Sequence, residues 1–344
     1  MNEISARLNE ISLTKNIPLT ATLELTYLCP FKCIHCYIPY ARRKNAIWKQ
    51  KELKTEEWKQ SLREIKKAGC LYIVFTGGEP LLRNDLGELC RYAVKLNLSV
   101  KVFTTGFNLK DEFLRRIKNL PISFELSLYG RERIHNMITG DGKSFQTTLK
   151  SARLLKKSGF GVKLKMPLMK QNFKDAEYIK ELAQRYNFTY AFDPIITLSG
   201  SNKKILKYRL TDRQLTKILS DKRLGLFPEI NKKRTDHHLN FICGAGRNTF
   251  AINPYGEIFP CLEIPKILGN VKKNKFVSVW RENKWLLWWR NLTMKDVKVC
   301  SRCSLSDFCN RCPGIALMED GDLMGPSTLA CQTAKIIKTL SSNL

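Results

Sequence analysis

The chain places three cysteines within the stretch Cys29-Pro30-Phe31-Lys32-Cys33-Ile34-His35-Cys36, with three and then two residues between them. Thiolates are the usual ligands of iron–sulfur clusters and are also common ligands of structural zinc. A [4Fe–4S] cluster that only transfers electrons is held by four thiolates, so three thiolates leave one iron open to another ligand. The spacing predicts a metal centre, and a structural zinc knuckle is the alternative that spacing alone leaves open.

The residues just before the cysteines predict where this centre lies in the fold. Thr22-Leu23-Glu24-Leu25-Thr26 alternates polar and apolar side chains, as a strand does. The cysteines therefore open a loop at the C-terminal end of a strand. Barrel enzymes and open α/β enzymes carry their catalytic loops at this edge of the sheet.

Strand and helix patterns alternate from residue 20 to about residue 220. Further strands are expected at residues 71–75, 99–104, 123–128, 161–166 and 189–192. Helices are expected at residues 55–68 (with Thr55 as the N-cap), 85–96, 110–117, 144–157 and 173–186, and after Thr211-Asp212. This alternation predicts a parallel sheet with right-handed crossovers. Six units are too few to close an eight-fold barrel, so we expect an α/β fold with a partial, open (βα)6 barrel.

The pattern changes after Lys232-Lys233-Arg234, where short segments replace helical periodicity. Seven of the twelve cysteines lie in this last part of the chain. We therefore expect an N-terminal segment over residues 1–17, a barrel over residues 18–235 and a small cysteine-rich domain over residues 236–344. This last part is called the tail below.

Composition and charge narrow the class of protein. The N-terminus has no signal-peptide pattern, and the longest apolar runs, such as Trp285-Leu286-Leu287-Trp288-Trp289, are too short to span a membrane. Twelve cysteines without an export signal indicate metal or redox use in a reducing cytoplasm. The net charge of +28 would suit an acidic partner. No nucleic-acid motif accompanies it, so we expect a lysine-rich solvated surface and no nucleic-acid partner.

A second motif, Thr76-Gly77-Gly78-Glu79-Pro80, follows the second expected strand. Its two glycines permit a positive φ and close approach of the backbone to a ligand. Glu79 offers a hydrogen-bond acceptor at the same edge of the sheet as the cysteines. Alone, such a turn is compatible with any connection between a strand and a helix.

Together, the two motifs resemble those of the radical S-adenosylmethionine (radical SAM) superfamily, over roughly residues 18–220. The resemblance implies a [4Fe–4S] cluster on Cys29, Cys33 and Cys36 whose open iron chelates SAM. Reductive cleavage of SAM would then give a 5′-deoxyadenosyl radical that takes hydrogen from a substrate. The residues implied to border SAM are His35, Gly77, Gly78, Glu79, Pro80, Thr105 and Ser127.

The tail cysteines allow two interpretations. Cys300-x2-Cys303-x5-Cys309-x2-Cys312 alone is typical of a zinc ribbon. With the remaining tail cysteines, the arrangement resembles the SPASM extension of radical SAM enzymes, which carries auxiliary [4Fe–4S] clusters. The resemblance implies one group made of Cys300, Cys303, Cys309 and Cys331 and a second made of Cys243, Cys261 and Cys312.

This sequence departs from the SPASM pattern in the second group. The last cysteine pair is spaced by two residues where the family usually has three, and no second cysteine follows Cys243 closely. The fourth ligand is therefore open, with His238 and Glu263 as candidates. Cys70 and Cys90 are expected to be buried core thiols. An aromatic stripe is expected to form a domain-docking face, and it consists of Trp280, Trp285, Trp288, Trp289 and Leu292.

The strand end Ser127-Leu128-Tyr129-Gly130 and the tail pattern are similar to those of peptide maturases. We therefore expect an oxidoreductase-type enzyme that modifies a ribosomally made precursor peptide. Its expected partners are an electron donor such as flavodoxin or ferredoxin and a separate leader-binding protein or a surface groove. Modification of a small molecule or tetrapyrrole is the alternative, and a zinc-bearing basic nucleic-acid-binding protein is the non-enzyme alternative. The sequence assigns no catalytic acid or base.

Overall fold

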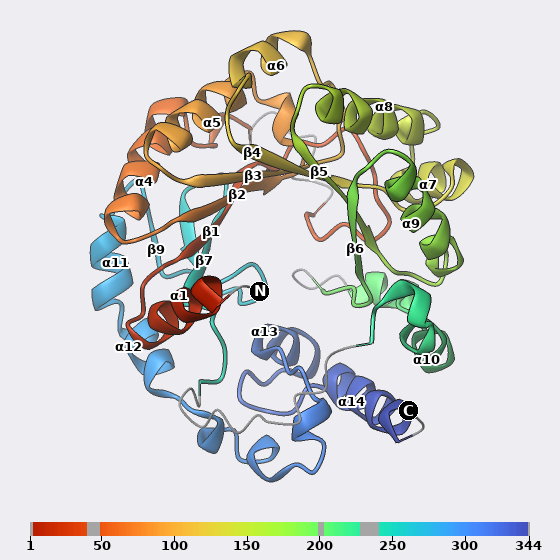
Figure 1. Ribbon diagram of the computed structural model, residues 1–344. Helices are drawn as coiled ribbons and strands as arrows, with labels where there is room; N and C mark the ends of the chain where they lie inside the picture. Colours follow the sequence, from red (N-terminus) through yellow and green to blue (C-terminus); the bar gives the residue numbers. More distant parts are fainter. Residues whose placement is uncertain (1–2, 40–48, 199–202, 228–240, 343–344) are drawn as a thin grey trace.

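The computed structural model describes residues 3–39, 49–198, 203–227 and 241–342 and is built around a curved, nine-stranded sheet (Figure 1). The strand order is β6-β5-β4-β3-β2-β1-β7-β8-β9. The strands are β1 Thr20–Thr26, β2 Tyr72–Gly77, β3 Ser99–Thr104, β4 Ile122–Ser127, β5 Gly161–Pro167, β6 Thr189–Asp193, β7 Thr249–Ile252, β8 Glu257–Phe259 and β9 Gly269–Asn270. All neighbours from β6 to β7 are parallel, whereas β8 and β9 pair antiparallel.

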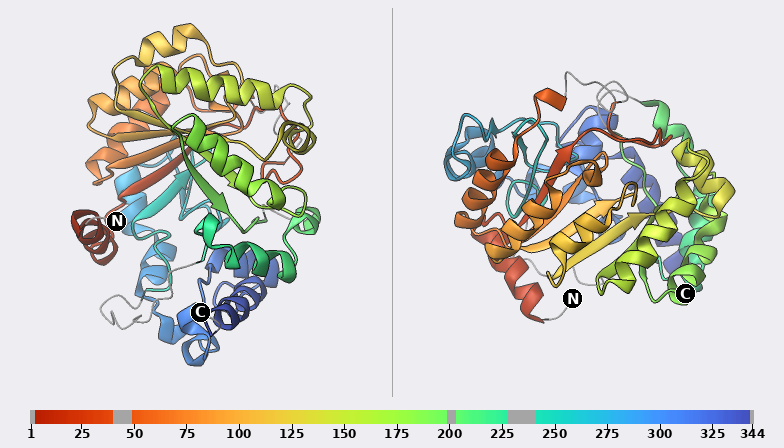
Figure 2. Two further views of the ribbon diagram at one scale, coloured as in Figure 1. Left: turned by 45° about the vertical axis from the view of Figure 1, so that its right-hand side comes forward. Right: turned by 90° about the horizontal axis from the view of Figure 1, so that it is seen from above.

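Helices cover the outer face of this sheet (Figure 2). They are α4 Thr55–Lys67, α5 Leu86–Lys95, α6 Asp111–Ile117, α7 Glu132–Thr139, α8 Ser144–Lys157, α9 Ala176–Arg185 and α10 Asp212–Ser220. The apolar faces of α4, α5, α6, α8 and α9 pack on the sheet in one continuous core, in which Trp58 of α4 and Phe75 of β2 are fully buried. The expected partial (βα)6 barrel is confirmed, and all six expected strands end within two residues of their predicted limits.

Local details differ from expectation at four helices. Thr55 is the first residue of α4 and not its N-cap, because Lys54 caps the helix and the Thr55 hydroxyl donates to Asp85 at 2.7 Å. A short 3-10 turn, Phe173–Asp175, precedes α9. The sequence pattern did not predict α7, nor the N-terminal helix α1 Glu3–Thr14.

The tail continues the barrel sheet beyond its first strand. β7 pairs parallel with β1, and the turn at Asn253 leads back into β8. The sheet therefore crosses the expected domain boundary at residue 235, which itself lies outside the described residues. The tail also holds α11 Phe276–Glu282, α12 Lys284–Asn291, α13 Pro313–Ile315 and α14 Thr328–Ser341. The expectation of only short segments is wrong for α14, a helix of 14 residues.

Two tryptophans of the aromatic stripe are buried, one against the main core and one within the tail. Trp280 belongs to the main core, packs on Phe250 of β7 and donates its indole N–H to the Asn16 carbonyl at 2.6 Å. Trp289 packs within the tail and donates to the Ala245 carbonyl at 2.7 Å. These contacts agree with a docking role for Trp280 but not for Trp289, and Trp288 is 46% exposed.

A buried ion pair and an apolar contact join the tail to the opposite end of the sheet. The guanidinium of Arg209 binds both carboxylate oxygens of Glu319, and its Nε donates to the Ile196 carbonyl at 2.7 Å. Nearby, α10 and α14 pack together through buried leucine and isoleucine side chains. The tail thus lies across the side where the barrel is open, as Figure 1 shows. None of the described helices is long and apolar enough to cross a membrane.

The Arg209–Glu319 pair gives a stability prediction. Both side chains are at most 15% exposed, so replacing Glu319 by Leu leaves a charged guanidinium without its partner in a mostly dry contact. We expect Glu319→Leu to lower the free energy of unfolding by about 3 kcal/mol. The double variant Arg209→Met/Glu319→Leu removes both charges and should recover most of that loss. Urea unfolding followed by circular dichroism measures both, and a double variant less stable than the single one would contradict this account.

Candidate active site and metal centres

The three-cysteine loop follows β1 at the C-terminal edge of the sheet, as predicted. Cys29, Cys33 and Cys36 are each half-buried. Burial raises the pKa of Tyr129 well above its usual value, and negative charge on Cys33, Cys36 and Cys29 raises it further. The charges of all three thiols act on the Tyr129 phenol, so the three cysteines lie in the same small region. Three thiols in one place fit a [4Fe–4S] cluster with one iron left for another ligand.

The end of α7 holds the cysteine loop in position. The backbone N–H of Lys32 donates to the Thr139 carbonyl at 2.8 Å, and that of Ile34 donates to the Ile138 carbonyl at 3.0 Å. Gly140 ends the helix with a φ of 68°, and a Cβ there would lie 3.3 Å from the side chain of Lys32. The loop is therefore anchored to the end of α7 by main-chain bonds.

An aromatic stack lies beside the thiols. The ring of Tyr129 meets the edge of His35 at a centroid distance of 4.8 Å and stacks on His135 at 5.2 Å. The Tyr129 N–H donates to Nδ1 of His135 at 3.0 Å, so the neutral imidazole carries its proton on Nε2. Burial lowers the pKa of His35 to about 4. Burial, with a smaller effect of His35, lowers the pKa of His135 to about 3.

Gly77 and Gly78 pack directly on the backbone that leads into Cys29. The Gly78 N–H donates to the Thr26 carbonyl at 2.7 Å, and the Glu79 N–H donates to the Leu28 carbonyl at 2.8 Å. A Cβ on Gly78 would lie 2.2 Å from the Leu28 oxygen, and Gly77 has a φ of 124°. Only glycine allows this approach, so the two motifs are physically joined.

The Glu79 carboxylate is fully buried and accepts four hydrogen bonds from the protein. Oε1 accepts from the Thr104 hydroxyl at 2.6 Å and the Leu81 N–H at 3.0 Å. Oε2 accepts from the Thr105 N–H at 2.8 Å and from the Thr105 hydroxyl. Burial raises the pKa of Glu79, and these hydrogen bonds oppose the rise. The side chains expected to border SAM thus bind each other here, and their direct contact with SAM stays a prediction.

The other expected residues lie along the same edge. Pro80 is buried and opens the 3-10 turn Pro80–Leu82. Ser127 ends β4, and its hydroxyl bonds with Tyr129. Sequence reasoning missed Tyr129 and Thr104 as site residues. The position of Tyr129 directly before a glycine with a φ of 133°, at a strand end, is the signal that could have found it.

The first expected group of tail cysteines surrounds a common cavity. Cys300, Cys303, Cys309 and Cys331 line a space of about 50 Å³ together with Arg311. Four thiols around one space fit a cluster with every iron ligated. Among the residues that the structure describes, no three His, Cys, Asp or Glu side chains converge as the ligands of a single metal ion would. Four cysteine thiolates are also a ligand set of structural zinc, so this geometry alone is compatible with either centre.

The second group also comes together. Burial raises the pKa of Cys261 to about 12, and negative charge on Cys243 and Cys312 adds to the rise. Burial likewise raises the pKa of Cys312, on which the charges of Cys243 and Glu263 also act. The Glu263 carboxylate accepts a bond from the Thr197 hydroxyl at 3.1 Å. Three thiols with one carboxylate nearby fit a cluster whose fourth ligand is not a cysteine. The other candidate, His238, lies outside the described residues.

Cys70 and Cys90 are fully buried in the main core, which confirms that they are core thiols. Burial raises the pKa of Cys70 to about 12 and that of Cys90 further. The ten cysteines that are only half-buried are the ones in the three expected groups.

The buried neutral His135 predicts a loss of stability in acid. Its pKa of about 3 in the folded protein lies below the usual 6.5. As the pH falls below 6.5, the unfolded chain binds a proton here and the folded chain does not, so stability decreases until the pH nears 3. We expect wild type to lose about 1–2 kcal/mol more between about pH 7 and about pH 5 than His135→Asn, whose amide oxygen can still accept the Tyr129 bond. Urea unfolding of the metal-free proteins measures this, and equal losses would contradict the assignment.

Comparison with known proteins agrees with this geometry. A family model described as the radical SAM superfamily matches residues 23–183. A second, the SPASM iron–sulfur cluster-binding domain, matches residues 243–313. Together, the two matches contain the glycine turn and every cysteine of the three expected groups apart from Cys331.

Solved structures share the fold over nearly the whole chain. SuiB of Streptococcus suis bound to S-adenosylmethionine has a TM-score of 0.72 and 18% sequence identity, over 96% of this chain and 81% of that chain. SuiB bound to its precursor peptide SuiA gives the same TM-score and identity, over 96% and 80%. Native anSMEcpe with bound AdoMet and the Cp18Cys peptide has a TM-score of 0.66 and 17% identity, over 95% and 97%.

Radical SAM enzymes use SAM with a [4Fe–4S] cluster, and SPASM domains bind auxiliary iron–sulfur clusters. The chain therefore belongs to the radical SAM superfamily of enzymes and carries a SPASM domain in its C-terminal part.

Proposed function

We propose that this enzyme takes hydrogen from a ribosomally synthesised precursor peptide and so modifies it after translation. The observation that carries the proposal is the fold shared over 96% of this chain with SuiB, which has been solved with its precursor peptide bound. Support comes from anSMEcpe, which shares the fold and has been solved with the Cp18Cys peptide. No specific observation favours a small molecule or a tetrapyrrole.

In this proposal, each part of the site has its own task. Cys29, Cys33 and Cys36 would hold a [4Fe–4S] cluster, which when bound would supply the electron for the reductive cleavage of SAM. The backbone of Gly77 and Gly78 borders SAM, together with His35, Pro80, Thr105 and Ser127. Glu79 fixes the ends of β2 and β3 relative to each other, so these groups meet SAM in a preformed arrangement.

The tail is assigned to electron transfer and to the substrate side of the site. The closed group around Cys300 suits electron transfer, because every iron position there has a thiol. The group around Cys261 lies beside Thr197 and Glu263, next to the end of β6, where a substrate would reach the barrel. We assign the barrel to residues 18–235 and the auxiliary-cluster domain to residues 236–344. An electron donor such as flavodoxin or ferredoxin and a leader-binding protein complete the proposed set of partners.

Deuterium transfer tests the proposal. The anaerobically reconstituted enzyme is given SAM, a reductant and a candidate precursor peptide labelled with deuterium at carbon. We expect the peptide to change in mass and deuterium to appear in 5′-deoxyadenosine, because the radical takes the atom directly from the peptide. Cys33→Ala should abolish both while the iron of the tail is retained. Cleavage of SAM with no label transfer from any peptide encoded beside the gene would count against a peptide substrate.

Two alanine pairs test the assignment of the tail cysteines. Cys300→Ala/Cys331→Ala removes two ligands from one group, whereas Cys300→Ala/Cys312→Ala removes one ligand from each. If each group holds its own cluster, the first pair should lose about four irons per chain and the second about eight. Iron and sulfide analysis after reconstitution measures both losses. The same loss in the two pairs would show that the grouping is wrong.

A further inference from the structure

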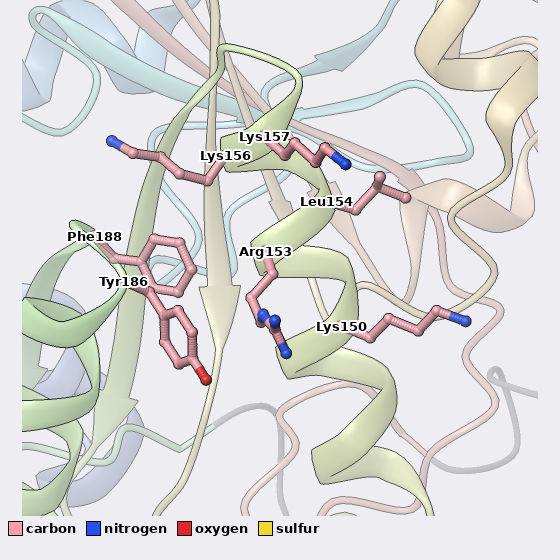
Figure 3. Close-up of a pocket in the computed structure, with 7 residues that line it drawn as sticks. All are labelled: Lys150, Arg153, Leu154, Lys156, Lys157, Tyr186 and Phe188. Carbon is pink, nitrogen blue, oxygen red and sulfur yellow. The ribbon is translucent and has the colours of Figure 1, made fainter.

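A pocket of about 560 Å³ lies on the outer, helical layer of the barrel, away from the cysteine loop (Figure 3). It is lined by Lys150, Arg153, Leu154, Lys156, Lys157, Tyr186 and Phe188. Lys157 ends α8 just before β5, and Phe188 directly precedes β6. The pocket therefore lies toward the N-terminal ends of these strands, whereas the SAM site is at their C-terminal ends. Nothing in the proposed chemistry uses it.

All the charged side chains that line this pocket are positive. The sequence has no Asp or Glu between Asp141 and Asp175, a segment that includes all of α8. The ion pairs nearest in sequence belong to Lys163, which binds Glu125, and to Arg131, which binds Asp175. In the described part of the chain, the four cations that line the pocket form no ion pair. Such uncompensated positive charge attracts anions.

The floor of the pocket is apolar and already organised. The rings of Tyr186 and Phe188 stack at a centroid distance of 5.7 Å, and the Arg153 guanidinium lies 5.1 Å from the centroid of Tyr186. Figure 3 shows Arg153 and Lys156 on the side of α8 that faces these rings. A nucleic-acid base needs an aromatic face on which to stack. Phe188 is buried and Tyr186 is already engaged by its neighbours, so an acidic peptide fits this pocket better than a nucleic acid.

The cations are spaced to match an extended peptide. Lys150, Arg153 and Lys157 fall at i, i+3 and i+7 and lie along one face of α8. They span about 10 Å along the helix axis, which is the length of about three residues of extended chain. Two or three carboxylates on such a segment can pair with the row, while an apolar side chain of the same segment contacts the exposed part of Tyr186.

We propose that this pocket binds an acidic segment of the substrate peptide that also carries an apolar residue. The proposal rests on the proposed peptide-modifying function and names where the peptide is recruited. The strands next to the pocket are about 20 Å long, so about ten residues of extended peptide are enough to reach from the pocket to the opposite edge of the sheet. The acidic segment is thus held at one end of the barrel while another part of the peptide enters the SAM site.

Fluorescence anisotropy with a charge-reversed variant tests the proposal. The probe is a short fluorescein-labelled peptide in which glutamates flank one phenylalanine, and the same peptide with glutamines is the comparison. We expect the reconstituted enzyme to bind the acidic probe in a salt-dependent manner and to show no binding of the glutamine probe. Lys150→Glu/Lys157→Glu should weaken binding about tenfold, because it turns two attractive contacts into repulsive ones.

The matched control is Lys67→Glu/Lys217→Glu. Lys67 ends α4 as Lys157 ends α8, and both control lysines are exposed on helices. This variant makes the same change in net charge and should bind the probe as wild type does. Equally weakened probe binding in the pocket variant and in the control variant would overturn the proposal that the pocket is the binding site. Tighter binding of a single-stranded oligonucleotide that is lost only in the pocket variant would overturn the peptide as ligand.

The test separates this inference from the proposed function. Anisotropy measures binding without turnover, and SAM cleavage without peptide should be the same in wild type and both variants. If Lys150→Glu/Lys157→Glu transfers label at the full rate and with an unchanged KM, the pocket does not recruit the peptide. The proposed peptide modification would then still stand. If wild type binds the probe through the pocket but transfers no label from a peptide, the proposed peptide modification is rejected and the binding pocket stands.

Discussion

The buried carboxylate of Glu79 is the interaction on which the site depends. It accepts hydrogen bonds from the turn after β2 and from the end of β3, while the backbone beside it is bonded to the residues leading into Cys29. A buried carboxylate is tolerated only when its oxygens are satisfied, and here four donors satisfy them. The four hydrogen bonds therefore fix the position of the Glu79 carboxylate relative to the ends of β2 and β3. The cysteine loop, the glycine turn and the end of β3 are held relative to one another before any ligand binds.

A second constraint acts on a larger scale, because the barrel is open and the tail connects its two ends. β7 extends the sheet beside β1, whereas Arg209–Glu319 and the α10–α14 contact fasten the tail near β6. Both tail cysteine groups belong to this connection. Their positions relative to the SAM loop therefore follow from contacts at both ends of the sheet, and any change in the curvature of the barrel would move them.

The local pattern was enough to predict the six barrel strands, because each pairs with the strand that precedes or follows it along the chain. It could not predict that β7 pairs with β1, since no periodicity encodes a partner more than 200 residues away. Thr55 was misplaced by one position because its hydroxyl binds Asp85 of the next helical unit instead of capping its own helix. The cysteine groups came from the family resemblance and their proximity from the structure. The roles of Tyr129 and Thr104 depend on neighbours that only the folded chain brings together.

The pairing of β7 with β1 has a consequence for how the protein is made. Synthesis proceeds from the N-terminus, so β1 leaves the ribosome long before residues 249–252 exist. During that interval β1 has an unpaired side, and an unpaired strand edge invites association with other chains. The most distant pairing in the sheet thus forms only after all six barrel strands have been made. Until then β1 is an open edge of the nascent barrel, and the arrival of β7 is what covers it.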